Sequence, residues 1–448
     1  MNRSKEITIA GAGLVGSLLG VLLGQQGYRV RLIERRSDSR KQSVDSGRSI
    51  NLALSERGRH ALRLAGLMDQ VDSLLIPMRG RMLHSVDGQT ELVPYGQRPH
   101  EVIYSVSRQE LNSVLLTAAE DASGVEVAFD QKVTEIDFDA KQLVVVDVPS
   151  SQTKSQDFDL LIGADGAGSR VRRALIKTTA GNSRSEFLDH DYKELEIPRI
   201  DGKHAMEPEA LHIWPRGGYM LIALPNLDGS FTVTLFLPKT GEPSFESLSD
   251  AGAVEQFFQQ QFPDAVSLMP NLIEDWRDHP AGRLGTVYCS PWHYQDCGLI
   301  LGDASHAIVP FHGQGMNAGF EDCSELLRLL DQNDHAWAAT LPEFEQLRKP
   351  DADAIAEMAI ENYTTMRSGV IDEKFQLKKE LGFELERRFP DSFVPRYSMV
   401  MFHRVPYADA QRQGDLQQQI LAELVEGKSR LDQVDFERAA QLIRDRLN

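Results

Sequence analysis

The spacing of apolar residues at the start of the chain predicts a strand, a glycine turn, a helix and a second strand. Residues 7–10 (ITIA) form a short apolar run that is typical of a buried strand. Residues 11–27 begin with closely spaced glycines and continue with apolar positions at helical spacing, and residues 28–34 (YRVRLIE) read as another strand. Together these segments have the size of one β-α-β unit, which takes about 30 residues.

Similar patterns continue to about residue 190, interrupted by a loop rich in Arg, Ser and Asp from Arg35 to Arg48. The helix at 107–122 has Ser107 as its expected N-cap, because a serine hydroxyl can accept from a free backbone N–H of the first turn. Residues 79–106 alternate like strands, and we expect further strands at 49–55, 125–129, 132–138, 142–148 and 158–163. The strands at 132–138 and 142–148 should bound a hairpin. Helices are expected at 55–67 and after residue 166.

From about Tyr192 the chain becomes rich in β-branched and aromatic residues separated by turn residues, which predicts a separate, mostly antiparallel sheet ending near Pro238. A helix is expected at 251–263, residues 299–317 resemble a return to the first domain, and helices should follow Leu341 almost to the end. We therefore divide the chain into four predicted segments: 1–190, 191–280, 281–340 and 341–448.

Composition narrows the classes of partner. The formal net charge of −18 disfavours nucleic acid and anionic membrane surfaces, since both require basic patches. Three cysteines in 448 residues argue against a disulfide framework and favour a reducing cytoplasm. We see no signal peptide and no apolar run of the roughly 18 residues that a membrane span needs, so we expect a soluble cytoplasmic protein.

A dinucleotide-binding pattern occupies the first turn. Gly11, Gly13 and Gly16 form GxGxxG between a predicted strand and helix, and Glu34 ends the next strand. Glycines there let the backbone approach a pyrophosphate at the helix N-terminus, and the acid can receive ribose hydroxyls. An acid at that position disfavours a bound 2′-phosphate, so the tightly bound nucleotide should not be NADP. A glycine-rich turn without a ligand is the alternative.

Two later segments share a strand–turn–helix layout. One contains Asp165 and Gly166, which alone fit any helix with a capping aspartate. In the other, Asp303 at a strand end can accept from sugar-like hydroxyls, while Gly313 and Gly315 permit positive φ and close ligand approach. A helix starting near Met316 would direct its positive end at a flat ring that becomes anionic on reduction, such as a flavin. A ligand-free capping loop is the alternative.

Metal binding is not expected. His306 and His312 lie on this loop without a third ligand at metal-type spacing. No nucleophile elbow and no phosphate-binding Walker sequence is present either.

The ordered trio of GxGxxG, GADG and GDASH resembles the FAD-dependent aromatic hydroxylases, with Ser305 a small departure from the commoner alanine. Further segments are similar to those members of the family that hydroxylate L-kynurenine. They include GRSINLALSERG, MRGRM, PYG, LHIWP, SFTVTLF, VPFHGQGMN, ENY and PRYSMV, and the resemblance extends from Ile7 to about Tyr407. It implies an α/β (α+β) fold: a Rossmann-like FAD-binding domain formed by the first and third segments, a substrate-binding antiparallel sheet, and a C-terminal helical region covering the substrate pocket.

The resemblance also implies a reaction. NADPH would reduce bound FAD, O2 would add to give a C4a-hydroperoxyflavin, and its distal oxygen would be transferred to the ring carbon of L-kynurenine ortho to the aniline nitrogen. In such enzymes the cofactor performs the redox chemistry and the protein positions substrate and excludes water. NADPH visits transiently and has no Rossmann domain of its own, which agrees with the single GxGxxG.

Site residues follow from the resemblance by position. Contacts to FAD are implied for Gly11, Gly13, Val15, Gly16, Glu34, Arg35, Ala53, Arg108, Val133, Asp303, Gly315, Met316 and Asn317. Polar contacts to the substrate are implied for Arg81, Tyr95, Asn362 and Tyr397. The residues implied to line the pocket for the aromatic ring are Leu211, Met220, Leu224, Thr234, Phe236, Pro310, Phe311 and His312. No protein side chain is expected to act as a catalytic group, because the flavin carries the chemistry.

Two alternatives stay open. Antiparallel strands with Arg81 fit any aromatic carboxylate, so the substrate could be another aromatic acid. A non-catalytic protein that uses FAD as a redox sensor would carry the same nucleotide-binding motifs.

Overall fold

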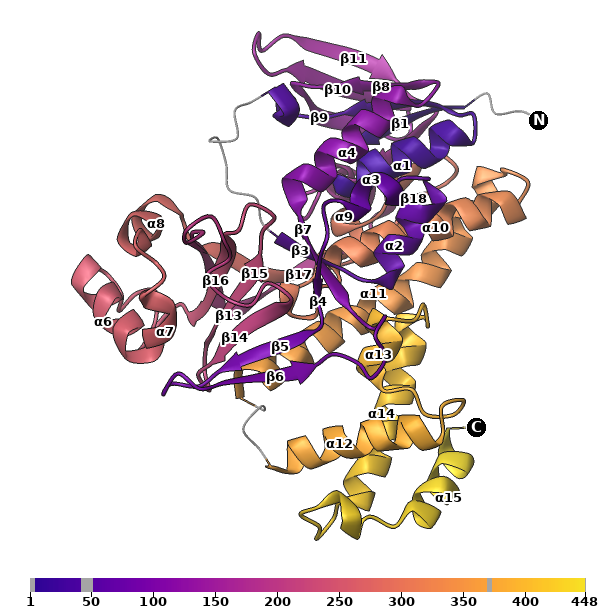
Figure 1. The fold of residues 1–448 in the computed structure, drawn as a ribbon. Helices are drawn as coiled ribbons and strands as arrows, with labels where there is room; N and C mark the ends of the chain where they lie inside the picture. The colour runs from indigo at the N-terminus through magenta and orange to yellow at the C-terminus, as the bar shows by residue number, and fades with distance from the viewer. Residues whose placement is uncertain (1–4, 42–50, 369–372, 448) are drawn as a thin grey trace. The chain divides into compact units, whose positions relative to one another are not determined.

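A computed structural model describes residues 5–41, 51–368 and 373–447 (Figure 1). Residues 42–50, which include the second half of the predicted Arg/Ser/Asp-rich loop, lie outside the described residues. The chain forms two compact units, each assembled from three separate stretches. The first unit comprises Met1–Leu75, Val106–Phe187 and Gly285–Ala356, and the second comprises Ile76–Ser105, Leu188–Leu284 and Glu357–Asn448. These units group the chain differently from the four predicted segments, since residues 76–105 belong with the later sheet and the C-terminal helices.

The first unit contains a six-stranded sheet of the predicted Rossmann-like type. Its order is β18 (His293–Tyr294), β19 (Gly298–Ile300), β12 (Leu160–Gly163), β1 (Glu6–Ala10), β2 (Arg29–Ile33) and β8 (Val125–Ala128). All neighbours are parallel except β18 and β19. Ile7, Ile9 and Leu161 are fully buried, which explains why the central strands β1 and β12 are mostly apolar: parallel strands are covered on both faces.

Helices and a small sheet complete this unit. Helix α1 (Leu14–Gln25) packs against α4 (Arg108–Asp121) and α10 (Gly315–Gln332). The predicted hairpin is confirmed, because β9 (Gln131–Asp137) pairs antiparallel with β10 (Gln142–Asp147), which pairs with β11 (Thr153–Asp157). The predicted cap of α4 is also confirmed, since Ser107 accepts from Glu110 N at 3.3 Å. The other elements here are η1 (Ser39–Lys41), β3 (Asn51–Leu54), α2 (Glu56–Leu64), α3 (Met68–Asp72), α5 (Arg170–Thr179), α9 (Asp303–His306) and η3 (Pro310–His312).

A seven-stranded sheet organises the second unit. Its order is β17 (Gly282–Ser290), β13 (Asn182–Ile197), β16 (Phe231–Pro238), β15 (Met220–Pro225), β14 (Ala210–Pro215), β5 (Gly80–His84) and β6 (Thr90–Pro94). The predicted antiparallel pairing over 192–238 is confirmed by the registers of β13 to β16. Strand β5 joins this sheet parallel to β14, a pairing that the sequence pattern did not reveal. Two short strands, β4 (Ile76–Met78) and β7 (Ile103–Ser107), pair antiparallel.

Three helices cover one face of this sheet: α6 (Ala251–Gln261), α7 (Pro263–Val266) and α8 (Leu272–Asp278), which gather beside β13 to β16 in Figure 1. Helix α6 begins at the N-cap Asp250, which accepts from Ala253 N at 3.0 Å. Trp214, Phe231 and Phe258 are fully buried in the core between sheet and helices. Because apolar burial drives folding, this core fixes which face of the sheet is occupied by helices.

The predicted C-terminal helices are present. They are α11 (Trp337–Ser368), which crosses from the first unit into the second, α12 (Glu373–Arg388), α13 (Arg396–Met401), α14 (Tyr407–Leu424) and α15 (Phe436–Arg446), with η5 (Leu431–Gln433). A separate apolar core unites α12, α14 and α15 through buried residues such as Leu381, Ile420 and Leu442. Across the described ranges, none of the helices combines the length and the apolar character that crossing a bilayer requires.

Candidate active site

The glycine turn of the first unit has an opening at its second glycine. Gly11 has φ +100°, and a Cβ there would lie 2.5 Å from Ala164 O. A Cβ at Gly16 would overlap Gly11 O, so the first and third glycines are required by the turn and by close helix packing. A Cβ at Gly13 would meet no atom of the described residues within 4 Å. Gly13 is the N-cap of α1 and therefore faces the open space in which an anion could approach the helix N-terminus.

Glu34 lies directly after β2 and is 6% exposed. Its Oε2 accepts from Ala12 N at 3.0 Å, and its Oε1 accepts from Arg36 Nε at 2.9 Å. Burial raises the pKa of this carboxyl, but hydrogen bonds and charge from Arg36, with the Ala12 amide, outweigh burial and lower the pKa. Glu34 is thus ionised, and its remaining lone pairs can accept ribose hydroxyls.

The aspartate of the second motif supports the start of α5, beside the N-cap Ser169. Asp165 accepts from Arg170 N at 2.6 Å and Val171 N at 3.3 Å at the start of α5. Arg172, two residues into that helix, donates to Ala304 O at 2.7 Å. The helix that follows the GADG segment therefore helps to hold the α9 turn that carries Asp303.

The third motif departs from the prediction at one glycine. Gly302 (φ +58°) and Gly313 (φ +64°) adopt the left-handed conformation, whereas Gly315 does not. The expectation of positive φ at Gly315 was wrong, because this residue is the first of α10 and has helical geometry. Asp303 begins α9 at the end of β19 with an exposed side chain, where it can accept from a ligand's hydroxyls.

Asn317 ties the surrounding segments together. Its Oδ1 accepts from Ser55 N at 2.9 Å, and its Nδ2 donates to Ala53 O and Gly313 O, each at 2.8 Å. The side chain is fully buried, so these three bonds fix the 313–317 segment against β3. Asn317 therefore shapes the predicted ring-binding loop through its side chain, which leaves its backbone for a ligand.

A buried charged network behind this loop was missed by the sequence reasoning. Asp322 Oδ2 accepts from Gly302 N at 2.9 Å and His306 Nε2 at 2.6 Å, while its Oδ1 accepts from Arg348 Nε at 2.8 Å. Burial raises the pKa of Asp322, but the charges of His306 and Arg348 outweigh it and lower the pKa to about 2. Arg348 also pairs with Glu321 at 3.0 Å. The only sequence signal was two adjacent acids in an apolar helix, which belong to no motif.

The remaining predicted FAD residues leave room for a ligand. Arg35 and Arg108 are exposed, and Arg108 is the first residue of α4. Val15, Ala53, Val133, Gly315 and Met316 are half-buried. Among the described residues, no carboxylate forms an ion pair with Arg108, so its charge is available for a phosphate. The open Gly13 cradle, ionised Glu34, Arg108 and exposed Asp303 fit a dinucleotide such as FAD.

In the second unit, strand register brings the predicted substrate residues onto one face of the sheet. Directly paired residues share a face, and neighbours along a strand point to opposite faces. Arg81 pairs with Leu211, Met220 pairs with Phe236, and Ala223, on the opposite face, pairs with His212 and Val233. The shared face therefore carries Arg81, Leu211, Met220, Leu224, Thr234 and Phe236. The opposite face is filled by the α6–α8 core, so this face is the one that can hold a ligand.

Arg81 lies against two tyrosines. Its Cζ is 5.6 Å from the ring centroid of Tyr95 and 5.1 Å from that of Tyr397, and the two rings stack with centroids 5.7 Å apart. Burial lowers the pKa of Arg81, but its interactions with the two phenol oxygens outweigh this effect and raise the pKa. Burial raises the pKa of both tyrosines, so they are neutral hydrogen-bond donors. Arg81 Nε is buried and has no hydrogen-bond partner among the described residues.

Asn362 lies near the end of α11, in the second unit. Its Nδ2 is 3.4 Å from Met366 Sδ, and the adjacent Tyr363 packs edge-on against His190 with ring centroids 5.3 Å apart. His190 of β13 pairs with Pro238 of β16, on the same face as Phe236. Three of the four predicted polar contacts thus form one cluster, and Asn362 lies on a helix that covers the same sheet face. The predicted Pro310, Phe311 and His312 belong to the first unit, where Phe311 and His312 are buried.

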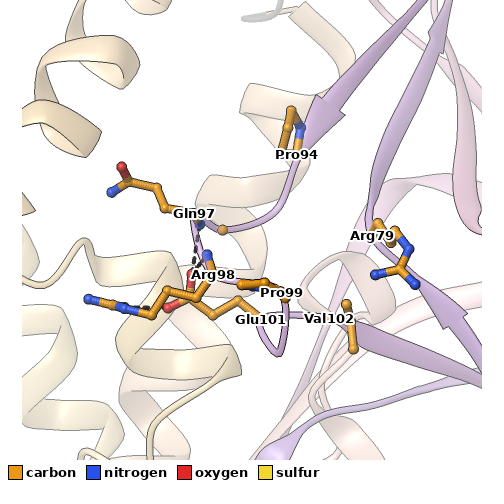
Figure 2. A pocket seen from close by; sticks show the side chains of 8 residues that line it. Arg79, Pro94, Gln97, Arg98, Pro99, Glu101 and Val102 are labelled. Atoms are coloured by element: carbon orange, nitrogen blue, oxygen red, sulfur yellow. Dashed lines mark hydrogen bonds and ion pairs between the residues drawn. The ribbon is translucent and has the colours of Figure 1, made fainter. Parts of the chain in front are cut away.

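The second unit also has a surface pocket of about 360 Å³ that is not the predicted substrate site (Figure 2). It is lined by Arg79, Pro94, Gly96, Gln97, Arg98, Pro99, Glu101 and Val102. Arg98 pairs with buried Glu101 at 2.5 Å, and Gln97 N donates to the same carboxylate at 2.7 Å. The charged and polar groups of this loop therefore already hydrogen-bond to one another. Among the described residues, no group of three or more His, Cys, Asp or Glu side chains is placed to hold a metal ion.

Comparison with known proteins agrees with this geometry. A family model described as "FAD binding domain" matches residues 4–359. The chain is 49% identical over 434 residues to kynurenine 3-monooxygenase of Stenotrophomonas maltophilia, covering 97% of this chain and 95% of the relative. It is 48% identical to kynurenine 3-monooxygenase of Myxococcus xanthus, covering 99% and 96%.

Solved structures share the fold at lower identity. The tetrameric form of 2-methyl-3-hydroxypyridine-5-carboxylic acid oxygenase aligns with TM-score 0.65 at 18% identity, covering 82% of this chain and 94% of that one. PqsL of Pseudomonas aeruginosa, in complex with 2-aminobenzoylacetate, aligns with TM-score 0.66 at 19% identity, covering 81% and 96%. Given the family match and the near full-length relatives, the chain belongs to the FAD-binding domain family and, within it, is an FAD-dependent monooxygenase of the kynurenine 3-monooxygenase family.

Proposed function

We propose that this protein hydroxylates L-kynurenine to 3-hydroxykynurenine, with FAD as bound cofactor, NADPH as transient reductant and O2 as oxidant. The observation that carries the proposal is the sheet face that Arg81 shares with its strand partner Leu211 and, further along the sheet, with Met220 and Phe236. A carboxylate-binding group beside an apolar surface matches a molecule with a carboxylate at one end and an aromatic ring at the other. The names of the near full-length relatives support the choice of L-kynurenine.

The proposed contacts to FAD all come from the first unit. Glu34 would receive the adenosine ribose, Gly13 and the α1 N-terminus would admit the pyrophosphate, Arg108 would offer it a charge, and Asp303 would receive the ribityl chain. Bound FAD supplies the redox and oxygen-activating chemistry. The N-terminus of α10 directs its positive end at the 313–316 segment, which favours a ring carrying negative charge.

For the substrate, the second unit supplies orientation. Arg81 binds the carboxylate, and its buried Nε, which has no hydrogen-bond partner among the residues described, provides a free donor. Tyr95 and Tyr397 donate their hydroxyls, and Asn362 its amide. The apolar face receives the aromatic ring and keeps water away from it, which matters because an activated oxygen that meets no substrate is lost as peroxide.

The test is an NADPH-oxidation screen of the flavin-loaded protein against aromatic acids, with identification of the product. We expect L-kynurenine to stimulate NADPH use sharply and to give 3-hydroxykynurenine. If another aromatic acid alone stimulated NADPH oxidation, that acid would be the substrate in place of L-kynurenine. NADPH use that no aromatic acid changes would instead favour a non-catalytic redox sensor.

Arg81 allows a more specific test against a matched control. Arg81→Ala should weaken L-kynurenine binding about 10- to 150-fold, the equivalent of one charged hydrogen bond, with normal FAD content. Arg81→Lys should recover only part, because an ammonium lacks the planar fork. Arg79→Ala is the control, since Arg79 lies two residues away but pairs at the surface with Glu209 at 2.6 Å. Equal affinity in the Arg81 and Arg79 variants would refute the proposed binding of the carboxylate by Arg81.

We also propose a cytoplasmic location, a small molecule as the partner, and no nucleic-acid or membrane partner. The three cysteines are free and buried, as suits a reducing compartment. The net charge of −18 supports the exclusion of polyanionic partners.

A further inference from the structure

A second cation, a lysine of α12, lies close enough to Arg81 for the two charges to interact. Lys379 of α12 is half-buried, and its Nζ lies 5.8 Å from the ring centroid of Phe383. Within the part of the chain that the structure describes, no carboxylate comes within ion-pair distance of Arg81 or Lys379. Burial, and next the charge of Arg81, lower the pKa of Lys379 to about 8, while Glu91 acts in the opposite direction. Two such cations close together are costly unless an anion joins them.

The position of Lys379 also follows from how α12 is anchored. Gln97 Nε2 donates to Glu386 Oε2 at 2.7 Å and to Phe383 O at 3.0 Å, and Arg98 pairs with Glu386 at 2.9 Å. Gln97 and Arg98 belong to the loop drawn in Figure 2, directly after Tyr95. Lys379 precedes Glu386 by two helical turns, so both side chains lie on the same face of α12. That face is therefore directed at the segment that carries Tyr95, about 10 Å along the helix from the Glu386 anchor.

The charged and titratable groups around Lys379 favour a bound anion. Arg81 of β5 contributes a positive charge, while Tyr95 and Tyr397 are neutral donors. Glu91 of β6 is the one acid that acts on Lys379 among the described residues; it shares the sheet face of Arg81, because Arg81 pairs with Val93 two residues further on. Glu91 is exposed and forms no ion pair with Lys379, so it does not neutralise the two cations.

We propose that Lys379 is a second cationic anchor for the substrate carboxylate, acting with Arg81 across the sheet face and helix α12. The inference rests on the proposed function and extends it, because it names a residue outside the motifs that resemble the family. A carboxylate between the two cations would replace their repulsion by attraction. Lys379 must be protonated to act, so the anchor is complete well below about pH 8 and is lost as the pH rises through that value.

The first experiment measures L-kynurenine affinity from the flavin absorbance of the holoenzyme between about pH 6.5 and about pH 9.5. At the lower pH, Lys379→Met should bind L-kynurenine about tenfold or more weakly than the wild type. Raising the pH should weaken binding by the wild type, and most of this pH-dependent loss should be absent in Lys379→Met. Lys379→Arg should retain affinity at both extremes, because guanidinium does not deprotonate in this range. Lys378→Met is the matched control on the same helix, about 100° further round, and should behave as wild type.

The second experiment measures proton uptake and separates an electrostatic role from a packing role. The ligand is the desamino analogue of L-kynurenine, in which hydrogen replaces the α-ammonium group, so that the ligand itself does not titrate. At about pH 8, binding should draw up to about 0.5 proton per site onto Lys379 of the wild type, and almost none in Lys379→Met. A packing defect in α12 could weaken affinity but would not abolish this uptake.

The outcomes are distinguishable. If wild type binds L-kynurenine while Lys379→Met and Lys378→Met share one affinity and one pH profile, the inference is wrong and the proposed function stands. Equal proton uptake in wild type and Lys379→Met would overturn it as well. If L-kynurenine neither binds nor stimulates NADPH use in the wild type, the proposed function itself fails.

Discussion

Replacing Gly13 by alanine tests whether the open side of the glycine turn is a ligand site. Within the described ranges, a Cβ at this position meets no atom within 4 Å, and the backbone angles of Gly13, φ −74° and ψ −174°, are accessible to alanine. The apo-protein should therefore keep its stability within about 1 kcal/mol, because a less favourable N-cap is offset by a stiffer unfolded chain. FAD binding should suffer, since the new methyl occupies the space through which the pyrophosphate approaches the α1 N-terminus.

The magnitude follows from what the methyl displaces. Loss of one charge-assisted hydrogen bond between a backbone N–H and a phosphate oxygen costs about 1.5–3 kcal/mol, or roughly 10- to 150-fold in the dissociation constant of FAD. Flavin fluorescence during titration of apo-protein measures this constant, and urea unfolding measures the stability. Wild-type FAD affinity in Gly13→Ala would refute the assignment of the pyrophosphate to this turn.

Two other glycines serve as controls. Gly218→Ala places a methyl in equally open space in the second unit and should change neither FAD affinity nor stability appreciably. Gly16→Ala places its Cβ on Gly11 O and should prevent the first unit from folding correctly. The contrast between Gly13 and Gly16 separates a ligand requirement from a packing requirement within one motif.

Three further predictions concern stability and reactivity. His212 is buried, and burial lowers its pKa to about 4, whereas the unfolded residue titrates near 6.5. The free energy of unfolding, measured with urea, should therefore fall by up to about 3 kcal/mol as the pH drops from about 6.5 to about 4. A flat profile would contradict this. Asn317→Ala should destabilise the protein by about 2–4 kcal/mol and weaken FAD retention, because three buried hydrogen bonds are lost; unchanged unfolding would show that the 313–317 segment is held otherwise. Burial raises the pKa of Cys289 to about 11, so a thiol reagent at about pH 8 should modify none of the three cysteines until the chain is unfolded, and rapid labelling of native protein would disagree.

Local features of this chain were determined by the sequence itself. The glycine turn, the Ser107 cap of α4 and the alternation over 192–238 depend on residues close together in the chain, so pattern and propensity were sufficient to predict them. The resemblance in three ordered motifs then indicated the family, because the motifs belong to one ligand although they are far apart in the sequence.

Contacts between distant segments were decided only by the tertiary structure. The surroundings of Arg81 depend on the parallel pairing of β5 with β14, which places Arg81 beside Leu211, 130 positions later in the chain. The register of this pairing determines which face of the sheet Arg81 occupies. Asp165 accepts from the first backbone N–H of α5, and Gly315 has helical geometry as the first residue of α10. Residue type alone did not determine these conformations, because they depend on the hydrogen bonds formed within each turn. The buried pairing of Asp322 with Arg348 leaves no periodic signal, since the energy of a buried charge depends on its partners rather than on its place in a pattern.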